Sequence, residues 1–446
     1  MKERFKKPES AMRALFLAFT VLCFAAALIA PDRNEMFAGL KRICMQSGQV
    51  VKSYFDPTYG GVSGTFLNTG LVCLACLLIY CLPEAKPDGL SALAFFLTAG
   101  FCFWGTTILN IWFSMAGVVL YAVIKKKSVG SLSNAMLFST GIGPLITEML
   151  FRFPYFKDTT EWSSHFTFGG ILIALAVGIF IGFMLPAGLG HSPNMHLGFD
   201  LYSAAVPIGL TAFFLRALLY KNIVPNVPDA EGVGLGDASN TLACYLFCAV
   251  VFGLAILVGI LTGGGKQYLA LLKDSGYSVD YTNKYGFSTT LLNLGVYGAF
   301  IVLYYTIIGA TWNAATIGVT FCMVACFAKG SHPRNVWPIM VGYVVASFLM
   351  KGVCQLTGAD FTLAINAQSI VIGLCFANGL SPVAGKYGWP FGIAFGMIHY
   401  FLVTSVPLMH GAFCLYNGGF TAGISCMLFM PVVQHFFKPI EERRKA

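Results

Sequence analysis

Residues 195–202 read MHLGFDLY, and residues 409–416 read MHGAFCLY. The two octapeptides share Met, His, Phe, Leu and Tyr at matching places, 214 positions apart. Each stands at the entry to an apolar run long enough to form a helix. A helix entry that is used twice in one chain raises the question of whether the whole chain is duplicated.

Four further pairs of segments support a duplication, because they occur in the same order in both halves. They are SGTFLNTG (63–70) with STTLLNLG (288–295) and WFSMAG (112–117) with WPIMVG (337–342), both shifted by 225, FSTGIGP (138–144) with FANGLSP (376–382), shifted by 238, and AVGIFIGFM (176–184) with AFGMIHYFL (394–402), shifted by 218. Collinear order and a nearly constant shift predict an internal duplication.

The composition indicates a membrane protein. Hydrophobic residues make up 57% of the chain and charged residues only 11%, with a mean hydropathy of +0.73. A soluble domain carries about 25% charged residues. Because backbone polar groups must be satisfied internally in lipid, we expect an all-α, polytopic membrane protein. The net charge of +9 arises from short Lys and Arg clusters between apolar runs, which indicate membrane topology and not nucleic-acid binding.

The hydropathy pattern predicts about fourteen transmembrane segments. They lie near 14–30, 62–82, 89–106, 107–124, 131–151, 167–187, 199–220, 237–262, 286–308, 312–328, 335–353, 362–381, 388–407 and 411–436. Whether segments 3, 4, 5 and 12 span fully or are re-entrant stays open. With both termini in the cytoplasm, the three strongest basic clusters fall on the cytoplasmic side, which favours the cytoplasmic (inner) membrane.

The pairs divide the chain into two repeats of seven segments, residues 1–220 and 237–446, joined by a non-cytoplasmic linker at 221–236. Because seven is odd, the second repeat enters the membrane from the opposite face. Inverted repeats are typical of secondary transporters and of some channels.

In such folds the site forms where helices break near the midplane. Matched Gly/Pro motifs, GIGP (141–144) and NGLSP (378–382), predict broken helices in segments 5 and 12. The predicted substrate-binding residues are Asn134, Thr140, Gly141, Gly143, Asn366, Gln368, Asn378, Gly379 and Ser381. Asn68 and Asn293 are expected to join helices instead.

Three ionisable residues within the apolar segments are ion-coupling candidates: Glu148, Asp200 and His399. Each has a structural alternative, because Glu148 can pair with Arg152, Asp200 can cap a helix and His399 can be a satisfied interior residue. Asp200 has Cys414 as its counterpart in the second octapeptide. The sequence predicts no metal site and no cofactor.

The predicted function is secondary transport of a small polar solute by alternating access, either facilitative or coupled to H⁺ or Na⁺. A passive channel for a small neutral solute is the alternative. We do not expect an enzyme, because the sequence contains no HExxH, GxSxG or P-loop motif. The oligomeric state is not predicted.

With its NTG/NLG segments and its FSTGIGP/FANGLSP pair, the chain resembles an uncharacterised family of prokaryotic integral membrane proteins, a domain of unknown function. The resemblance implies a membrane location and no activity. The seven-plus-seven inverted plan also resembles nucleobase and sulfate/bicarbonate carriers. This second likeness concerns architecture alone and implies no substrate.

Overall fold

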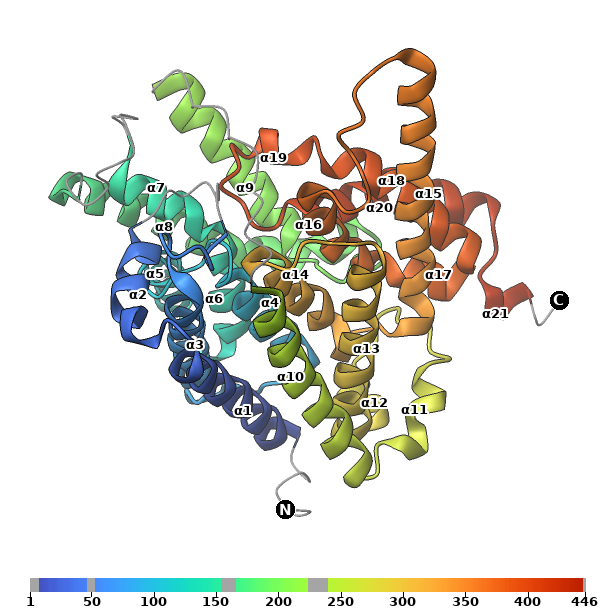
Figure 1. Ribbon diagram of the computed structural model, residues 1–446, viewed down its shortest axis with the longest axis horizontal. Helices are drawn as coiled ribbons and strands as arrows, with labels where there is room; N and C mark the ends of the chain where they lie inside the picture. The colour runs from blue at the N-terminus through green and yellow to red at the C-terminus, as the bar shows by residue number, and fades with distance from the viewer. Residues whose placement is uncertain (1–7, 46–52, 154–165, 224–239, 444–446) are drawn as a thin grey trace.

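The computed structural model describes residues 8–45, 53–153, 166–223 and 240–443 (Figure 1). Over these ranges all regular structure is helical, and no strand occurs. The expected all-α class is therefore confirmed. Most of the linker predicted at 221–236 lies outside the described residues.

The first half of the chain begins with a helical pair and ends with a long helix and its successor. Its helices are α1 (Pro8–Ile29), α2 (Met36–Cys44), α3 (Gly61–Tyr80), α4 (Gly89–Phe101), α5 (Ile111–Ile124), α6 (Ser133–Ser139), α7 (Gly143–Phe151), α8 (Phe168–Met195) and α9 (Ala205–Ala217), which continues as a π-helical turn over Leu218–Ile223.

The second half follows a similar order. Its helices are α10 (Thr241–Leu261), α11 (Gly265–Leu271), α12 (Tyr281–Tyr285), α13 (Phe287–Ile307), α14 (Ala314–Val324), α15 (Pro333–Thr357), α16 (Gln368–Ala377), α17 (Ser381–Tyr387), α18 (Trp389–Val403), α19 (Val406–Met409), α20 (Asn417–Phe436) and α21 (Ile440–Arg443).

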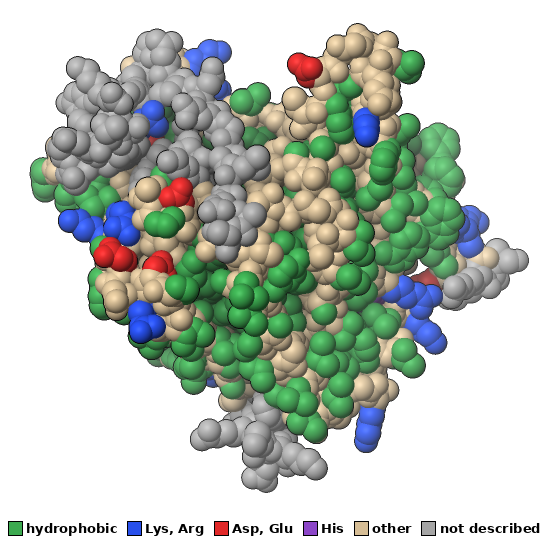
Figure 2. All heavy atoms as spheres, in the orientation of Figure 1, with side chains coloured by type: hydrophobic (Ala, Val, Ile, Leu, Met, Phe, Trp, Pro, Cys, Tyr) green, Lys and Arg blue, Asp and Glu red, His purple; other side chains and the backbone are tan. Residues whose placement is uncertain are grey.

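Nine helices of the described chain are long and apolar enough to cross a membrane, so the protein is a multi-pass membrane protein. The helices at Gly89–Phe101, Ile111–Ile124, Ala314–Ala328 and Trp389–Val403 are apolar but shorter. The predicted segment 131–151 is divided among α6, a 3₁₀ turn and α7. In the view of Figure 2, hydrophobic side chains cover the middle of the surface and charged side chains lie toward its edges.

The helices of the two halves pack in matching pairs. Helix α1 packs along α3 as α10 packs along α13, and α5 packs along α8 as α15 packs along α18. Helices α4 and α14 pack against each other at the centre (Figure 1). These pairings bring the elements that carry the matched sequence segments into similar surroundings.

Glycines allow α5 to approach α8 and α15 to approach α18 closely. Their contacts also show which residues of α8 and α18 match each other. A Cβ on Gly117 of α5 would meet backbone atoms of α8 at Ile179 and Gly182, and a Cβ on Gly342 of α15 would meet those of α18 at Ile393 and Gly396. The contacts pair α8 with α18 at a shift of 214, and the shift of 218 expected from AVGIFIGFM is wrong by one helical turn. Because four residues complete roughly one turn, both shifts place apolar residues on the same face.

Two buried asparagines make the same contacts in the two halves. Asn68 Nδ2 donates to the carbonyl oxygens of Cys102 (3.2 Å) and Thr106 (3.0 Å). Asn293 Nδ2 donates to those of Phe327 (2.8 Å) and Ser331 (2.9 Å), residues 225 positions later. Each amide thereby holds the link that follows α4 or α14, as the helix-joining prediction for these residues requires.

The Gly/Pro motifs tighten their helices and do not unwind them. The chain passes from α6 to α7 through a 3₁₀ turn at Thr140–Ile142, and from α16 to α17 through one at Asn378–Leu380. Pro144 and Pro382 lie in the first turn of the helix that follows, where a missing N–H costs no hydrogen bond. The α-helix is therefore interrupted at both motifs, as expected for segments 5 and 12, and each interruption is a 3₁₀ turn. The buried irregular backbone lies elsewhere, at 102–110, 196–204 and 410–416.

Candidate functional site

A cavity of about 280 Å³ lies between α4, α6, the end of α8 and the link 196–204 that joins α8 to α9. Its lining comprises Leu90, Leu93, Leu97, Asn134, Phe138, Leu189, Pro193, His196, Gly198, Asp200, Leu201, Tyr202, Ser203, Ala204, Ser278, Val279, Lys329 and Tyr416. Pro193 and Ser278 are exposed and mark its rim, whereas Asp200, Tyr202 and Tyr416 are buried. Its size suits a small solute.

The link 196–204 carries the octapeptide and folds as a tight turn. Leu197 and Gly198 both have left-handed backbone angles, with φ of 55° and 75°. The Gly198 N–H donates to Pro193 O (2.9 Å), and the Phe199 N–H donates to His196 O (3.0 Å). The link 410–416 repeats this turn, since Gly411 and Ala412 have φ of 62° and 60°. A left-handed Leu costs roughly 1–2 kcal/mol, so the turn is held by its surroundings.

Asp200 is only 2% exposed, and its two carboxylate oxygens differ. Oδ1 accepts the Tyr202 N–H at 2.9 Å, while Oδ2 has no hydrogen-bond partner among the described residues. The Asp200 N–H itself donates to His196 Nδ1 at 3.2 Å. A buried carboxylate oxygen without a partner is costly unless a proton or a ligand completes it.

His196 is fixed in one tautomer by these contacts. Because Nδ1 accepts the Asp200 N–H, Nε2 carries the ring proton and donates to Ser203 Oγ at 2.9 Å. The Ser203 hydroxyl hydrogen therefore remains a donor in the cavity wall. In the second link, His410 Nδ1 donates to Asn417 Oδ1 at 2.6 Å, so the same pair of positions is joined there.

Tyr202 and Tyr416 occupy matching places in the two octapeptides but have different hydrogen-bond states. The Tyr202 hydroxyl donates to Asn378 Oδ1 at 2.8 Å. The Tyr416 hydroxyl has no partner within the described part of the chain. At a shift of 238, the residue matching Asn378 is Thr140, whose side chain is too short to play the same part. Thr140 Oγ1 donates to Leu137 O instead, at 2.8 Å.

Each link forms a backbone hydrogen bond with the other half of the chain. The Leu201 N–H donates to Gly379 O at 3.1 Å, and the Leu415 N–H donates to Gly141 O at 2.9 Å. A side chain on Gly141 would collide with the Tyr416 ring, and one on Gly379 would collide with the Tyr202 ring. Both glycines were predicted to bind substrate. In the structure they bond the two links through their carbonyl oxygens and leave room for the tyrosine rings.

Among the predicted substrate-binding residues, Asn134 lines the cavity. Its Oδ1 accepts from the Tyr80 hydroxyl (2.8 Å) and from Ser91 Oγ (2.9 Å). The structure brings Asn378 next to Tyr202, but its amide is fully occupied, because Nδ2 donates to the Tyr297 hydroxyl (2.8 Å) and to Met323 O (2.7 Å). Asn378 therefore holds Tyr202, which lines the cavity, and does not belong to the lining itself.

The other predicted residues lie away from the cavity lining. Gln368 Oε1 accepts from Asn313 Nδ2 at 2.8 Å, and Ser381 Oγ lies 3.1 Å from Ser331 Oγ. Gly143 packs against the Asn110 side chain. Asn366 is exposed, in the link before α16. The cavity is thus formed by α4, α6 and the 196–204 link. Asn134 of segment 5 lines it, whereas none of the residues predicted in segment 12 belongs to its lining.

The three ion-coupling candidates differ in their surroundings. Glu148 is buried and lies 3.6 Å from Arg152 Nε, which is the ion pair that the sequence offered as an alternative. His399 Nδ1 lies 2.6 Å from the Tyr343 hydroxyl and its Nε2 lies 2.8 Å from Gly418 O, so both ring nitrogens are occupied. Asp200 lines the cavity. The geometry therefore favours Asp200 over Glu148 and His399 as the candidate ion-coupling residue.

Sequence reasoning missed His196, Ser203, Lys329 and Tyr416, which also line the cavity. The repeated octapeptide already contained His196 and Tyr416, but an apolar run that follows a histidine also fits an interfacial helix start. Lys329 follows α14 in the sequence and appeared as a topology signal only. Nothing in its neighbourhood signalled that the fold would place it in the lining of this cavity.

A strap over residues 272–280 covers the rim through Ser278 and Val279. The Tyr277 hydroxyl donates to Leu197 O at 3.0 Å. Asp274 Oδ2 lies 2.6 Å from Lys284 Nζ and accepts from the Tyr285 hydroxyl at 2.7 Å. Burial works against the charge of Asp274, but the hydrogen bonds from Lys284, the Gly276 N–H and Tyr285 outweigh it and lower its pKa.

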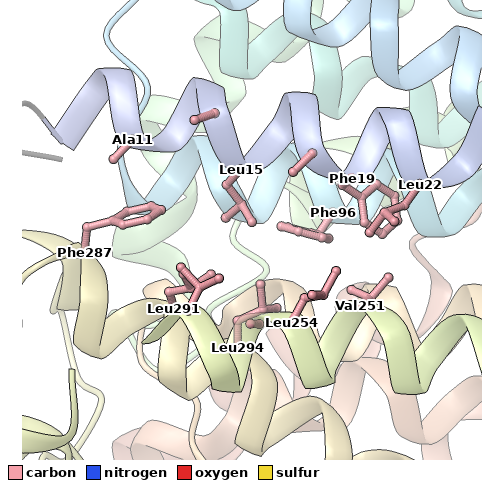
Figure 3. Close-up of a pocket in the computed structure, with 14 residues that line it drawn as sticks. Ala11, Leu15, Phe19, Leu22, Phe96, Val251, Leu254, Phe287, Leu291 and Leu294 are labelled. Carbon is pink, nitrogen blue, oxygen red and sulfur yellow. The ribbon is translucent and has the colours of Figure 1, made fainter. Parts of the chain in front are cut away.

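A second cavity, of about 160 Å³, lies between α1 and the α10–α13 pair and is apolar (Figure 3). Leu15 and Phe19 of α1 face Leu254 of α10 and Leu291 of α13 across it. Without polar groups it cannot orient a polar solute. In the described ranges no three His, Cys, Asp or Glu residues gather as metal ligands.

The sequence profile of one family matches most of the chain, over residues 32–221 and 264–435. That family is described as "Protein of unknown function (DUF1576)". The chain belongs to this family. The two matched stretches agree with the expected uncharacterised family with an internal duplication. No curated protein and no solved structure matches the chain. The DUF1576 membership fixes a family but no activity, so function rests on the site.

Proposed function

We propose that this DUF1576 protein is a secondary transporter that moves a small polar solute through the cavity beside Asp200. The observation that carries the proposal is a cavity inside a bundle of apolar helices that is lined by Asp200, a buried residue whose Oδ2 has no hydrogen-bond partner among the described residues. Such a group is costly to bury and is retained where an ion or a solute uses it. The irregular 196–204 link supplies the interrupted backbone on which transporter sites are commonly built.

The proposed architecture is fourteen segments in two inverted repeats, 1–220 and 237–446, with the linker 221–236 outside the cytoplasm. It is supported by contacts that recur at nearly constant shifts: the Asn68 and Asn293 amides, the turns after His196 and His410, and the exchanged backbone bonds of Leu201 and Leu415. Each link bonds the opposite half, as expected for elements related by a two-fold axis.

The membrane orientation follows from the basic loops. Lys273 lies in the strap, and Lys266 and Lys284 lie on either side of it in the sequence. Because basic loops stay in the cytoplasm, the rim of the cavity opens to the cytoplasmic side of the inner membrane, and both termini lie on that side. In alternating access, the equivalent surface around the 410–416 link opens to the other side when the first cavity closes. Asp200 is then the group that a coupling H⁺ or Na⁺ occupies while the solute is absent.

The experiment is a thermal-shift screen of a metabolite library, followed by counterflow of the best ligand in proteoliposomes. We expect a ligand that stabilises the protein to show trans-stimulated uptake, because a carrier returns faster when loaded. Asp200→Asn should remove ion dependence while the purified variant keeps its fold. Uptake without trans-stimulation would identify a passive channel for a neutral solute and overturn the carrier.

A further inference from the structure

Three polar residues of the cavity stand where the two halves of the chain differ. At the shifts established by packing and by the matched motifs, Asn134, Asp200 and Lys329 correspond to Ile372, Cys414 and Trp104. A residue needed for architecture would recur in both copies, as Asn68 and Asn293 do. Asn134, Asp200 and Lys329 are therefore retained for the occupant of one half, whereas His196 and Tyr202 recur in the second half as His410 and Tyr416.

The cavity wall carries two opposite charges that do not neutralise each other. The ion pairs among the described residues join Arg42 to Glu35, Arg152 to Glu148 and Lys284 to Asp274, and none includes Asp200 or Lys329. Lys329 is half-buried and Asp200 is buried, and both line the cavity. A solute in the cavity would therefore meet both side chains.

We propose that the cavity binds a small zwitterion, with its ammonium group at Asp200 and Tyr416 and its anionic group at Lys329. The proposal rests on the transport site proposed above and names its substrate class. Asp200 Oδ2 and the Tyr416 hydroxyl are buried atoms that have no hydrogen-bond partner among the described residues, and both can accept hydrogen bonds from an ammonium group. The aromatic residues Phe138 and Tyr202 also line the cavity, and aromatic rings attract cations.

Charge selects the zwitterion over its relatives. A solute with only a cationic group would be repelled by Lys329, and one with only an anionic group would be repelled by Asp200. With a neutral solute the buried carboxylate would need a proton instead of an ammonium group. The cavity of about 280 Å³ is far larger than the space of about 10–15 Å³ that one water molecule needs, and it suits a molecule of amino-acid size.

The test measures binding to the purified full chain by thermal unfolding, with the twenty common amino acids and glycine betaine as probes. For the best zwitterion we compare the matched amine, which lacks the carboxylate, and the matched acid, which lacks the ammonium. L-alanine, ethylamine and propionate form one such trio. We expect the zwitterion to bind at least tenfold more tightly than either analogue. Betaine has no N–H to donate, so a preference for a primary amino acid over betaine is expected if hydrogen bonds as well as charge hold the ammonium group.

Substitutions of Asp200 and Lys329 test whether these residues bind the two charged groups of the zwitterion. Asp200→Asn and Lys329→Gln should each weaken binding of the zwitterion at least tenfold, whereas Lys351→Gln, an exposed lysine of α15, should change it less than twofold. Tyr416→Phe serves if Asp200→Asn does not fold, since it removes a hydroxyl that bonds nothing in the described chain. An amine that binds as tightly as the zwitterion, or a panel with no Asp200-dependent ligand, overturns the proposal.

Flux measurements in proteoliposomes distinguish a failure of the zwitterion proposal from a failure of the transport proposal. A zwitterion that binds with dependence on Asp200 and Lys329 but shows no flux in proteoliposomes would refute transport and leave the binding class standing. A singly charged or neutral solute that is carried with trans-stimulation would refute the zwitterion and leave transport standing.

Discussion

Removing the two buried asparagine amides should cost similar free energies of unfolding, although they lie 225 positions apart. Asn68→Ala deletes the donors to Cys102 O and Thr106 O and also the acceptor for the Ile108 N–H, which is 3.0 Å from Oδ1. Asn293→Ala deletes the donors to Phe327 O and Ser331 O. Both substitutions leave carbonyl oxygens buried without these donors.

The magnitude follows from the bonds lost. Hydrogen bonds between membrane helices average about 0.6 kcal/mol and reach about 1.7 kcal/mol. A buried group left without a partner costs about 1–3 kcal/mol. With two or three bonds removed at each site, we expect each variant to lose about 2–4 kcal/mol of unfolding free energy.

Unfolding by SDS titration in mixed micelles measures these losses, and Asn134→Ala is the matched control. The hydroxyls that donate to Asn134 have second acceptors, Ser91 O for Tyr80 and Asp88 Oδ1 for Ser91, so its loss should cost about 1 kcal/mol or less. A cost below that of Asn134→Ala at either Asn68 or Asn293 would refute the reasoning.

Three further predictions concern the tyrosine pair, the strap and the interior histidine. Tyr416→Phe should leave thermal stability unchanged and weaken ligand binding, whereas Tyr202→Phe should lower the unfolding free energy by about 1–3 kcal/mol, because it breaks the bond to Asn378. The lowered pKa of Asp274 stabilises the fold above the ordinary carboxyl pKa, and this contribution disappears as pH falls through the folded-state value; Asp274→Asn should therefore flatten the loss of thermal stability as pH falls below 3.8, the ordinary carboxyl pKa. His399→Gln should lower stability without changing the pH dependence of transport, since both ring nitrogens hold structural bonds; a shifted pH profile would contradict this.

The membrane fold was predictable because hydrophobic length and collinear repeats are properties of the sequence itself. The predicted segments fall on helices, and the octapeptide pair reappears as two turns with the same backbone angles. The register of α8 against α18 was not predictable, because a one-turn slip keeps the same residues on the packed face.

The site was predicted only in part, for a reason visible at the Gly/Pro motifs. Gly141 and Pro144 are the residue types that break helices, yet the proline lies in a first turn and the glycine makes room for Tyr416. Asp200 was found because an ionisable residue in an apolar chain stands out. Lys329 was not, because its approach to the cavity depends on how α4 packs on α14.

Two-sided labelling at matched positions tests the central claim, alternating access between inverted repeats, most directly. Ser203 and Asn417 are equivalent partners of His196 and His410. In a background with the native cysteines replaced, Ser203→Cys should react with a membrane-impermeant thiol reagent from the cytoplasmic side, and Asn417→Cys from the opposite side. A bound ligand should raise one rate as it lowers the other. Reaction of both positions from the same side, or of both at once without exchange between them, would contradict alternating access.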